Sequence, residues 1–409
     1  MSARWKSAPL RQLCEFHNGL WTGKKPPFQT ARVIRNTNFT TDGKINLTDV
    51  AVLQVEQSQF AKRRLRKGDI IIEKSGGGPK QPVGRVVLYD LEADDFSFSN
   101  FTSVIRTKDR GALDPDYLHR VLYFWYVSGV TEPLQRRSTG IRNLDFDSYK
   151  NLEVPLPPLD EQKRIVAALD RAFAALDRAR ANAEVNLQDA RQLRSQSIED
   201  LLSDPQLGEP EPCGDHIELL VGFAFSSSGY TDKDDDIRLV RGDNIVQGAF
   251  RWNGVKRWPA GERTTYEKYE LARGDVLVAM DRTWISAGIK YAVVDDEALP
   301  SLLVQRVARL RAKPSIDPRY LAAWIGSPMF ERYVLSIQTG LGVPHVSGGQ
   351  LESFRIRVPS LDLQSRVIDR LAQLSDNCES LQSIYQRSTE DIAALRQCLL
   401  QAAFSGQLN

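Results

Sequence analysis

The sequence of 409 residues contains few of the side chains that most often build covalent or metal-dependent sites. It has four cysteines and four histidines, and these form no Cys-x-x-Cys pair and no zinc-finger spacing. Four scattered cysteines are typical of a reduced cytosolic protein in which the thiols are structural. The composition therefore excludes a disulfide framework and a cysteine-rich metal site.

Long apolar runs and an excess of one charge are also missing. No stretch of about 18 apolar residues occurs, which excludes a membrane-spanning helix, and the first ten residues lack the apolar core of a signal peptide. We therefore expect a cytoplasmic protein that does not contact a membrane. The 54 basic residues nearly balance the 52 acidic ones, for a net charge of +2. Binding to a polyanion would thus require positive charge concentrated on one face.

A long internal repeat is the strongest pattern in the chain. Leu65–Ile72 returns as Leu271–Val278, and Val33–Asn38 returns as Leu239–Asn244, both 206 positions later. Asp114–Leu118 returns 203 positions later, and further matches follow in the same order. Matches that stay collinear at so constant an offset indicate a tandem duplication. The chain length also favours two or more domains.

Each copy has the same expected plan. Runs of β-branched residues bounded by glycine and proline predict short strands, and apolar residues at helical spacing predict helices. The expected strands are Asp69–Glu73, Arg85–Tyr89, Val276–Ala279 and Ile289–Val294, and the expected helices are Tyr117–Val127 and Tyr320–Leu335. A proline-rich stop then precedes a long helix in each copy.

We therefore expect an α+β protein with two similar domains of mixed helices and strands. The first domain is expected at residues 1–157 and the second at residues 206–359. A long central helix is expected at residues 158–205 and a long C-terminal helix at residues 360–409.

The two long helices carry apolar residues at alternating spacings of four and three, which is typical of a coiled coil. The expected seam includes Leu169, Leu176, Asn186 and Leu193 in the first helix and Leu371, Leu374, Leu381, Ile392, Leu395 and Leu399 in the second. Asn186 either fixes the register, as a single buried asparagine can, or lies at the polar edge of the seam. Asp160 and Asp362 occupy the positions expected for helix N-caps.

A helix of about 40 residues is roughly 60 Å long, more than the diameter of a domain of this size. Each long helix therefore needs a partner besides its own domain, and the other long helix is the obvious one. The first helix leads from domain one to domain two and the second can only return, so we expect an antiparallel coiled coil and a pseudo-twofold tandem repeat. Such symmetry matches that of duplex DNA, and the helices would set a fixed gap between two half-sites.

The block Pro155–Gln162 at the start of the first long helix, the duplicated Gly-Asp strand and the C-terminal stretch Leu395–Leu408 complete a recognisable pattern. With these features the chain resembles the specificity subunits of type I restriction–modification systems, over nearly its whole length. The second copy of the block is degenerate, with Ser360 in place of a proline and Leu363 in place of the glutamate. This weakens the match locally but leaves the collinear pattern intact.

The resemblance implies two target-recognition domains that each read one half of a bipartite sequence in double-stranded DNA, and no catalytic centre in this chain. It also implies that the long helices and nearby surfaces recruit two copies of a methyltransferase subunit, and that a restriction subunit with translocase activity can join. Those partners would bind S-adenosylmethionine, ATP and Mg, so no cofactor and no metal is expected in this chain.

Three motifs that could carry chemistry of their own do not match the required pattern. Lys25–Phe28 is close to the Asn/Asp-Pro-Pro-Tyr/Phe loop of amino-methyltransferases, but its lysine offers no acceptor for a target amino group. Gly76–Lys80 lacks the order and spacing of a Walker loop and is either a flexible turn or a loop that contacts DNA. Asp69 and Glu73 precede a lysine, but not at the spacing of a nuclease site.

Phosphate contacts need Lys or Arg, and base contacts in a groove need Arg, Lys, Asn or Gln. Three loop regions in each domain carry such residues and differ between the copies. The candidates of the first domain are Arg35, Asn36 and Asn38, then Lys74, Ser75, Lys80 and Arg85, and then Arg136, Arg137, Arg142 and Asn143. Those of the second domain are Arg241 and Asn244, then Arg282, Trp284 and Lys290, and then Gln338 and His345. For each, a solvated surface residue is the alternative.

Because the copies differ at these loops, we expect two different half-sites. Two other functions remain open at this point. A coiled-coil adaptor that joins two proteins without DNA recognition would share the architecture but show no salt-sensitive affinity for DNA. An enzyme acting alone would methylate or cleave DNA as the purified chain with its cofactor.

Overall fold

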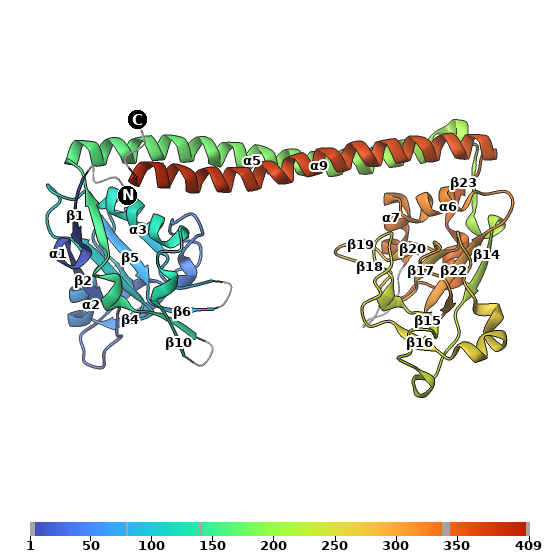
Figure 1. Ribbon diagram of the computed structural model, residues 1–409, viewed down its shortest axis with the longest axis horizontal. Coiled ribbons are helices and arrows are strands. Elements are labelled where there is room, and N and C mark those ends of the chain that lie inside the picture. The colour runs from blue at the N-terminus through green and yellow to red at the C-terminus, as the bar shows by residue number, and fades with distance from the viewer. Residues whose placement is uncertain (1–4, 79–80, 139–140, 338–343, 406–409) are drawn as a thin grey trace. The chain divides into compact units, whose positions relative to one another are not determined.

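The computed structural model of the chain describes residues 5–78, 81–138, 141–337 and 344–405. The chain divides into two compact units (Figure 1). The first unit comprises residues 1–183 and 387–409, and the second comprises residues 184–386. Within the described ranges, no helix combines the length and the apolar character that crossing a membrane requires.

A four-stranded antiparallel sheet, β2-β9-β5-β7, forms the centre of the first unit. Its strands are β2 (Cys14–Asn18), β9 (Thr102–Thr107), β5 (Asp69–Glu73) and β7 (Val86–Tyr89). All five residues of β5 are buried, because its isoleucines fill both faces of the sheet. Ile70 and Ile72 pack in the core that includes helix α3 (Pro115–Val127), whereas Ile71 packs in a second core on the other face.

Smaller elements complete the first unit. A second sheet has the order β4-β3-β8, a third the order β10-β11-β6, and β1 pairs with β12. Their strands are β4 (Ala51–Glu56), β3 (Phe28–Ile34), β8 (Phe96–Phe98), β10 (Gln135–Ser138), β11 (Ile141–Leu144), β6 (Ser75–Gly77), β1 (Lys6–Pro9) and β12 (Glu153–Leu156). The short helices are α1 (Leu10–Leu13), α2 (Gln57–Arg63) and α4 (Phe146–Tyr149).

The second unit repeats the central sheet, the β4-β3-β8 sheet and the β1-β12 pair of the first unit. Its central sheet has the order β14-β22-β17-β20, its second sheet the order β16-β15-β21, and β13 pairs with β23, while β18 and β19 form a hairpin. The strands are β14 (Ile217–Val221), β22 (Val307–Ala312), β17 (Val276–Ala279), β20 (Tyr291–Val293), β16 (Lys256–Trp258), β15 (Ile237–Val240), β21 (Ser301–Leu303), β13 (Pro210–Pro212), β23 (Arg355–Arg357), β18 (Trp284–Ile285) and β19 (Gly288–Ile289). The helices are α6 (Pro318–Ile325), α7 (Pro328–Ile337) and α8 (Gly348–Ser353).

One predicted helix of the second unit is wrong in its continuity. Residues 320–335 belong to two helices, α6 and α7, because the chain turns at Gly326 and Ser327 and resumes at Pro328. A proline lacks the backbone N–H that a continuous helix needs but is well suited to a first helical position. The Ser327 hydroxyl accepts a hydrogen bond from the backbone N–H of Phe330 and so holds the start of α7.

The repeat extends to individual side chains. In the first unit Gln162 accepts a hydrogen bond from the N–H of Asp114 and donates to the carbonyls of Ala112 and Pro157. In the second unit Gln364 makes the same three contacts, with the N–H of Asp317 and the carbonyls of Ser315 and Pro359. The buried carboxylates of Asp69 and Asp275 likewise each hold an arginine of the neighbouring strand in equivalent registers, Arg106 and Arg311. The duplication inferred from the sequence is therefore a duplication of the fold.

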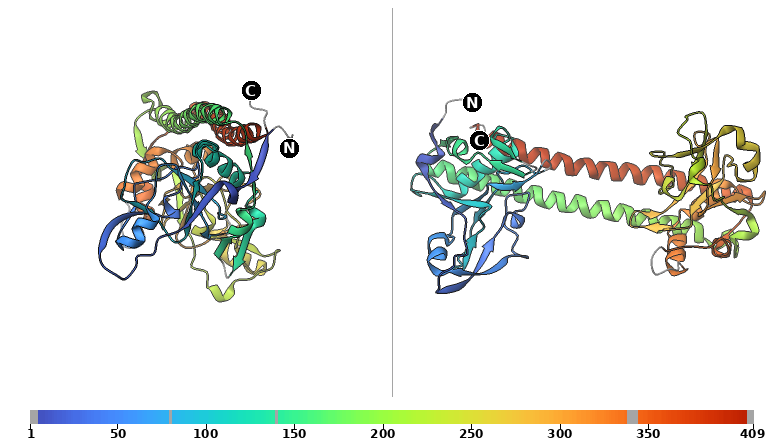
Figure 2. Two further views of the ribbon diagram at one scale, coloured as in Figure 1. Left: turned by 90° about the vertical axis from the view of Figure 1, so that its left-hand side faces the viewer. Right: turned by 90° about the horizontal axis from the view of Figure 1, so that it is seen from below.

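Two long helices, α5 (Leu159–Ser203) and α9 (Leu361–Phe404), each contribute a segment to both units. They pack together in opposite chain directions, with Asp177 bonded to Arg396 in the first unit and Arg194 to Ser375 in the second. In each unit the helix segments lie on the side where α3 or α6 lies (Figures 1 and 2). The predicted fold class, two similar mixed domains with an antiparallel pair of long helices, is confirmed.

The N-cap of each long helix was predicted two positions too late. Helices α5 and α9 begin at Leu159 and Leu361, so Asp160 and Asp362 lie inside the first turn and are not N-caps. A carboxylate in the first turn still interacts favourably with the positive end of the helix dipole.

The predicted heptad seam is correct for part of each helix only. Leu169 is buried, and Leu176, Leu371, Leu374, Ile392 and Leu399 are partly buried. In contrast, Asn186, Leu193, Leu381 and Leu395 are exposed. The predicted seam contact is therefore wrong for the three leucines, whereas exposure of Asn186 agrees with the alternative that it lies at the polar edge of the seam. A strict seven-residue repeat drifts by about 20° per heptad on a straight helix, and less exposed neighbours such as Leu187, Arg194, Gln382 and Arg396 take these places.

Candidate DNA-recognition surfaces

The first candidate loop follows β3 in the first unit and contains one residue that cannot contact DNA. Asn38 is only 3% exposed, and its amide nitrogen donates to the carbonyls of Asn46 and Asp49. Asn244 occupies the same position in the second unit, is equally buried and donates to the carbonyl of Arg251. The prediction that these two asparagines bind DNA is wrong, because their side chains hold the loop from within.

Arg35 and Asn36 lie at the surface beside a hollow of about 400 Å³. Arg35 pairs with the exposed carboxylate of Asp49 at 3.1 Å, and the Asn36 amide donates to Glu73. The hollow is also lined by Trp21 and Phe101, whose side chains are 65% and 48% exposed. These two aromatic residues were missed in the sequence, where single aromatic residues in loops carry no periodic signal.

The second loop region of the first unit combines surface and internal residues. Arg85 is only 11% exposed, because its guanidinium pairs with the buried carboxylate of Glu73 and donates to two backbone carbonyls. The prediction of a DNA contact at Arg85 is therefore wrong. Lys74 is half-buried and donates to Asn18, and both burial and the nearby charge of Lys150 lower the pKa of its amine.

The glycine-rich motif that follows Lys74 is partly a strand. Gly76 and Gly77 belong to β6, which pairs with β11 and brings Ser75 beside Asn143. The Ser75 hydroxyl donates to the amide oxygen of Asn143 at 2.5 Å. Lys80 lies outside the described residues, so its contact with DNA stays a prediction.

The third loop region of the first unit is the hairpin of β10 and β11. Arg136 is exposed and pairs with Asp145 at 2.7 Å, whereas Arg142 is largely buried beside Glu132. Arg137 lies in β10, but its side chain is outside the described residues. A phosphate can replace the carboxylate partner of an exposed arginine such as Arg136, since Arg offers the same forked donors to both groups.

The candidates of the second unit gather around Asp281. Its carboxylate accepts hydrogen bonds from His345 at 2.7 Å and from Arg306 at 2.5 Å. Burial alone would raise the pKa of Asp281, but these two donors lower it below its ordinary value. The adjacent Arg282 is exposed, and its backbone N–H donates to the carbonyl of Pro344.

The remaining candidates of the second unit are distributed around this cluster. Lys290 is half-buried among the charges of Asp243, Arg251, Arg282 and Asp281, and burial lowers the pKa of its amine. Trp284 is partly buried, and its indole N–H donates to Glu331 at 2.7 Å. Arg241 lies at the end of β15, in the position of Arg35. Gln338 lies outside the described residues.

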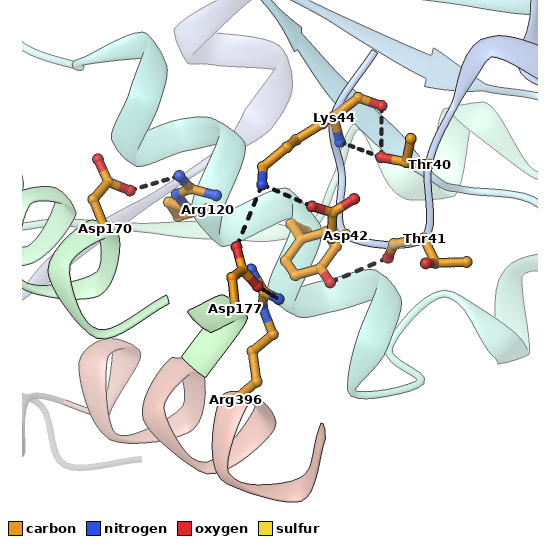
Figure 3. Close-up of polar contacts among 9 residues, drawn as sticks. Thr40, Thr41, Asp42, Lys44, Arg120, Asp170, Asp177 and Arg396 are labelled. Carbon is orange, nitrogen blue, oxygen red and sulfur yellow. Dashed lines mark hydrogen bonds and ion pairs between the residues drawn. The ribbon is translucent and has the colours of Figure 1, made fainter. Parts of the chain in front are cut away.

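Charged side chains connect the first recognition loop to the long helices in the first unit (Figure 3). Lys44 bonds to Asp42 and to Asp177 of α5, and Asp177 also accepts from Arg396 of α9. The guanidinium of Arg396 lies 4.3 Å from the centre of the Phe173 ring. Asp177 thus joins three segments that are far apart in the sequence.

Residues 3–187 match the type I restriction modification DNA specificity domain. The chain is 31% identical over 195 residues to the type I restriction enzyme EcoAI specificity subunit of Escherichia coli, an alignment that covers 47% of this chain but only 32% of that protein. It is 20% identical to the putative MjaX specificity subunit of Methanocaldococcus jannaschii, over 99% of this chain and 93% of the relative.

Solved structures have the same fold over the full length. The HsdS subunit from Thermoanaerobacter tengcongensis aligns with a TM-score of 0.65 at 18% identity, over 100% of this chain and 98% of that one. A chain from a structural study of complex assembly in a type I R-M system aligns with a TM-score of 0.77 at 19% identity, over 99% and 98%. Residues 3–187 thus match a DNA specificity domain of type I restriction–modification systems, and over its full length the chain has the fold of their specificity subunits.

The matched model is a DNA specificity domain, and the curated relatives are named as specificity subunits. Within the described ranges of this chain, no group of three or more His, Cys, Asp or Glu residues is arranged to hold a metal ion. The clusters that the structure does assemble are suited to binding. They combine arginine, lysine, amide and aromatic side chains at loops of two duplicated domains.

Proposed function

We propose that this chain is a specificity subunit that reads a bipartite sequence in double-stranded DNA, with one half-site bound by each unit. The proposal rests above all on the duplicated framework. The same buried contacts, such as those of Gln162 and Gln364, recur in both units. The surface residues on that framework differ, as at Asn36 and Gly242. A conserved scaffold with different loop residues is what two readers of different sequences require.

The electrostatics of the loops support DNA as the ligand. The whole chain has a net charge of only +2, yet exposed arginines such as Arg136, Arg282 and Arg306 collect at these loops. Each of them can exchange a carboxylate or water for a phosphate or a guanine edge. DNA binding would therefore be local and sensitive to salt.

We propose that the long helices carry the docking surface for partner subunits. In the second unit, Val185 and Leu193 of α5 and Ile384 of α9 are each more than half exposed. Apolar side chains on a helix face that its own domain does not cover are suited to packing against helices of another protein. The proposed partners are two methyltransferase subunits, joined in some complexes by a restriction subunit. They would supply S-adenosylmethionine, ATP and Mg, while this chain supplies recognition.

The decisive test is a selection of the full chain, with and without its methyltransferase subunit, from a pool of random DNA duplexes. Enrichment of two different short sequences at a constant separation is the expected result. Binding should weaken steeply as salt is raised, because each neutralised phosphate releases counterions. If the complex forms but no sequence is enriched, the chain is a protein–protein adaptor and the DNA proposal is wrong.

A further inference from the structure

Three framework positions meet at one point in each unit. In the first unit the N–H of Lys74 donates to the carbonyl of Phe101, and the N–H of Leu144 donates to the carbonyl of Lys74. In the second unit Met280, Arg306 and Val346 repeat both bonds. The repeated backbone bonds place three side chains together in each unit. These are Ser75, Phe101 and Asn143 in the first unit, and Asp281, Arg306 and His345 in the second.

The two sets of side chains have opposite chemical character. In the first unit the Ser75 hydroxyl bonds to the Asn143 amide, and the ring of Phe101 is 48% exposed. In the second unit a carboxylate, that of Asp281, holds an imidazole and a guanidinium. On the same backbone scaffold, the first unit thus has uncharged polar and apolar groups at the positions where the second unit has charged groups.

Asp281 orients both of its partners. A carboxylate only accepts hydrogen bonds, so the Nδ1 of His345, at 2.7 Å, must carry the hydrogen. The side chains of Arg306 and His345 remain 65% and 42% exposed. The guanidinium bonds to Asp281 through one Nη, so most of its five donors can meet a further acceptor.

The backbone at this cluster is strained. Arg306 has a φ of 64° and Arg282 a φ of 47°, and these are the only described residues other than glycine with a positive φ. Left-handed backbone costs free energy in a residue with a Cβ atom, and such strain collects at functional sites. Both strained residues are arginines whose side chains are exposed next to Asp281.

We infer that Asp281 positions Arg306 and His345 to read a G·C base pair in the second half-site, and that Phe101 reads a thymine at the equivalent place in the first half-site. The inference deepens the proposed function and rests on it. Guanine presents two acceptors, O6 and N7, in the major groove, and a guanidinium matches both. Thymine presents a methyl group there, which an exposed phenyl ring can contact.

The test exchanges the residues of this one position. Selections from random duplexes would compare the wild-type chain, Arg306→Phe and Phe101→Arg, each as the full chain with its methyltransferase subunit. Arg306→Phe should lose its guanine preference at one position of the second half-site by roughly tenfold or more, with the first half-site unchanged. Phe101→Arg should change one position of the first half-site from thymine to guanine.

Three further variants separate base reading from effects on folding and on charge. Arg273 is an exposed arginine paired with Asp296 in the same unit, so Arg273→Phe is the matched control and should leave both half-sites unchanged. Arg306→Lys keeps the charge but loses the forked donors, and Asp281→Asn keeps the shape but loses the charged acceptor. Both should weaken the guanine preference while the thermal midpoint remains close to that of the wild type.

The outcomes are distinct. If Arg306→Phe binds all duplexes more weakly but selects the same sequence, Arg306 contacts a phosphate and the inference is wrong. If Arg306→Lys selects the wild-type sequence at wild-type affinity, charge alone matters and the inference is equally wrong. If the wild-type chain itself enriches no sequence, the proposed function fails and the inference falls with it.

Discussion

Among single residues, the buried pair of Asp69 and Arg106 illustrates what the duplicated scaffold depends on. The Asp69 carboxylate is fully buried and accepts two hydrogen bonds from Arg106, at 2.6 and 2.7 Å. It also accepts from the backbone N–H of Arg66. Removing the arginine would leave a buried carboxylate without its counter-charge, which costs far more than the pair contributes as a whole.

We therefore expect Arg106→Met to lower the free energy of unfolding of the first unit by roughly 3 kcal/mol. Arg32→Met is the control, since Arg32 makes a similar two-pronged pair with Asp95 in an exposed place, and its loss should change the free energy of unfolding far less. Denaturant titration of the wild type and the two variants checks this. Equal losses in the free energy of unfolding for the two variants would contradict the role assigned to burial of the Asp69–Arg106 pair.

His119 gives the first unit a pH-dependent stability. It is buried in α3, and burial lowers its pKa from 6.5 to about 3. In the unfolded chain the imidazole takes up a proton below pH 6.5, whereas in the folded chain it stays neutral down to about pH 3. Protonation therefore favours the unfolded state as the pH falls through 6.5 towards 3.

At pH 5 this difference amounts to about 2 kcal/mol. We expect the wild type to lose stability between pH 7.5 and pH 5 more steeply than His119→Leu, which cannot be protonated. The two unfolding free energies should thus converge as the pH falls. If the free energies of unfolding of the wild type and His119→Leu stay parallel between pH 7.5 and pH 5, His119 does not titrate as described.

Among the elements, the start of each long helix depends on one glutamine. Gln162 is completely buried and satisfies one N–H and two carbonyls. Gln162→Glu would replace two donors by a carboxylate oxygen facing two carbonyl oxygens. We expect a loss of roughly 3 kcal/mol, seen as faster hydrogen exchange in α3 and the first turns of α5. Gln196→Glu, on the exposed surface of α5, should change stability by less than about 0.5 kcal/mol.

The outward face of the long helices carries the prediction for partner binding. Leu193 is 57% exposed, so Leu193→Glu should leave the thermal midpoint nearly unchanged. If this face docks the methyltransferase subunit, the same change should weaken that binding by roughly tenfold or more. DNA binding by the chain alone should not change. Wild-type affinity for the methyltransferase subunit would place the docking surface elsewhere.

The sequence predicted where strands and helices lie better than it predicted which of their side chains are buried, for physical reasons. Strands such as β5 and β17 were found at their observed ends, because continuous β-branched runs have few other structures open to them. The predicted coiled-coil seam was wrong at Leu193 and Leu395, because a seven-residue pattern and a straight helix diverge along the chain. Asn38 and Arg85 were taken for DNA contacts, because a polar side chain that satisfies internal carbonyls looks the same in sequence as one that faces solvent.

For the molecule as a whole, the proposed reading of two half-sites depends on the connection between the units. The chain passes between the units twice, within α5 and within α9, and both helices are continuous there. Neither passage is a flexible linker of the glycine- and serine-rich kind. If the proposed function holds, such continuous helices predict a preference for one separation of the half-sites over many.

We therefore expect DNA affinity to depend sharply on the gap between the half-sites. Adding five base pairs to the selected gap turns one half-site by about half a helical turn, so only one unit can bind and the affinity should fall by roughly 100-fold or more. Adding ten base pairs restores the rotation but not the distance. If α5 and α9 set the distance, affinity should remain low at ten added base pairs, in titrations at one salt concentration. Recovery at ten added base pairs would mean that the connection stretches, and that the helices orient the two half-sites without fixing their separation.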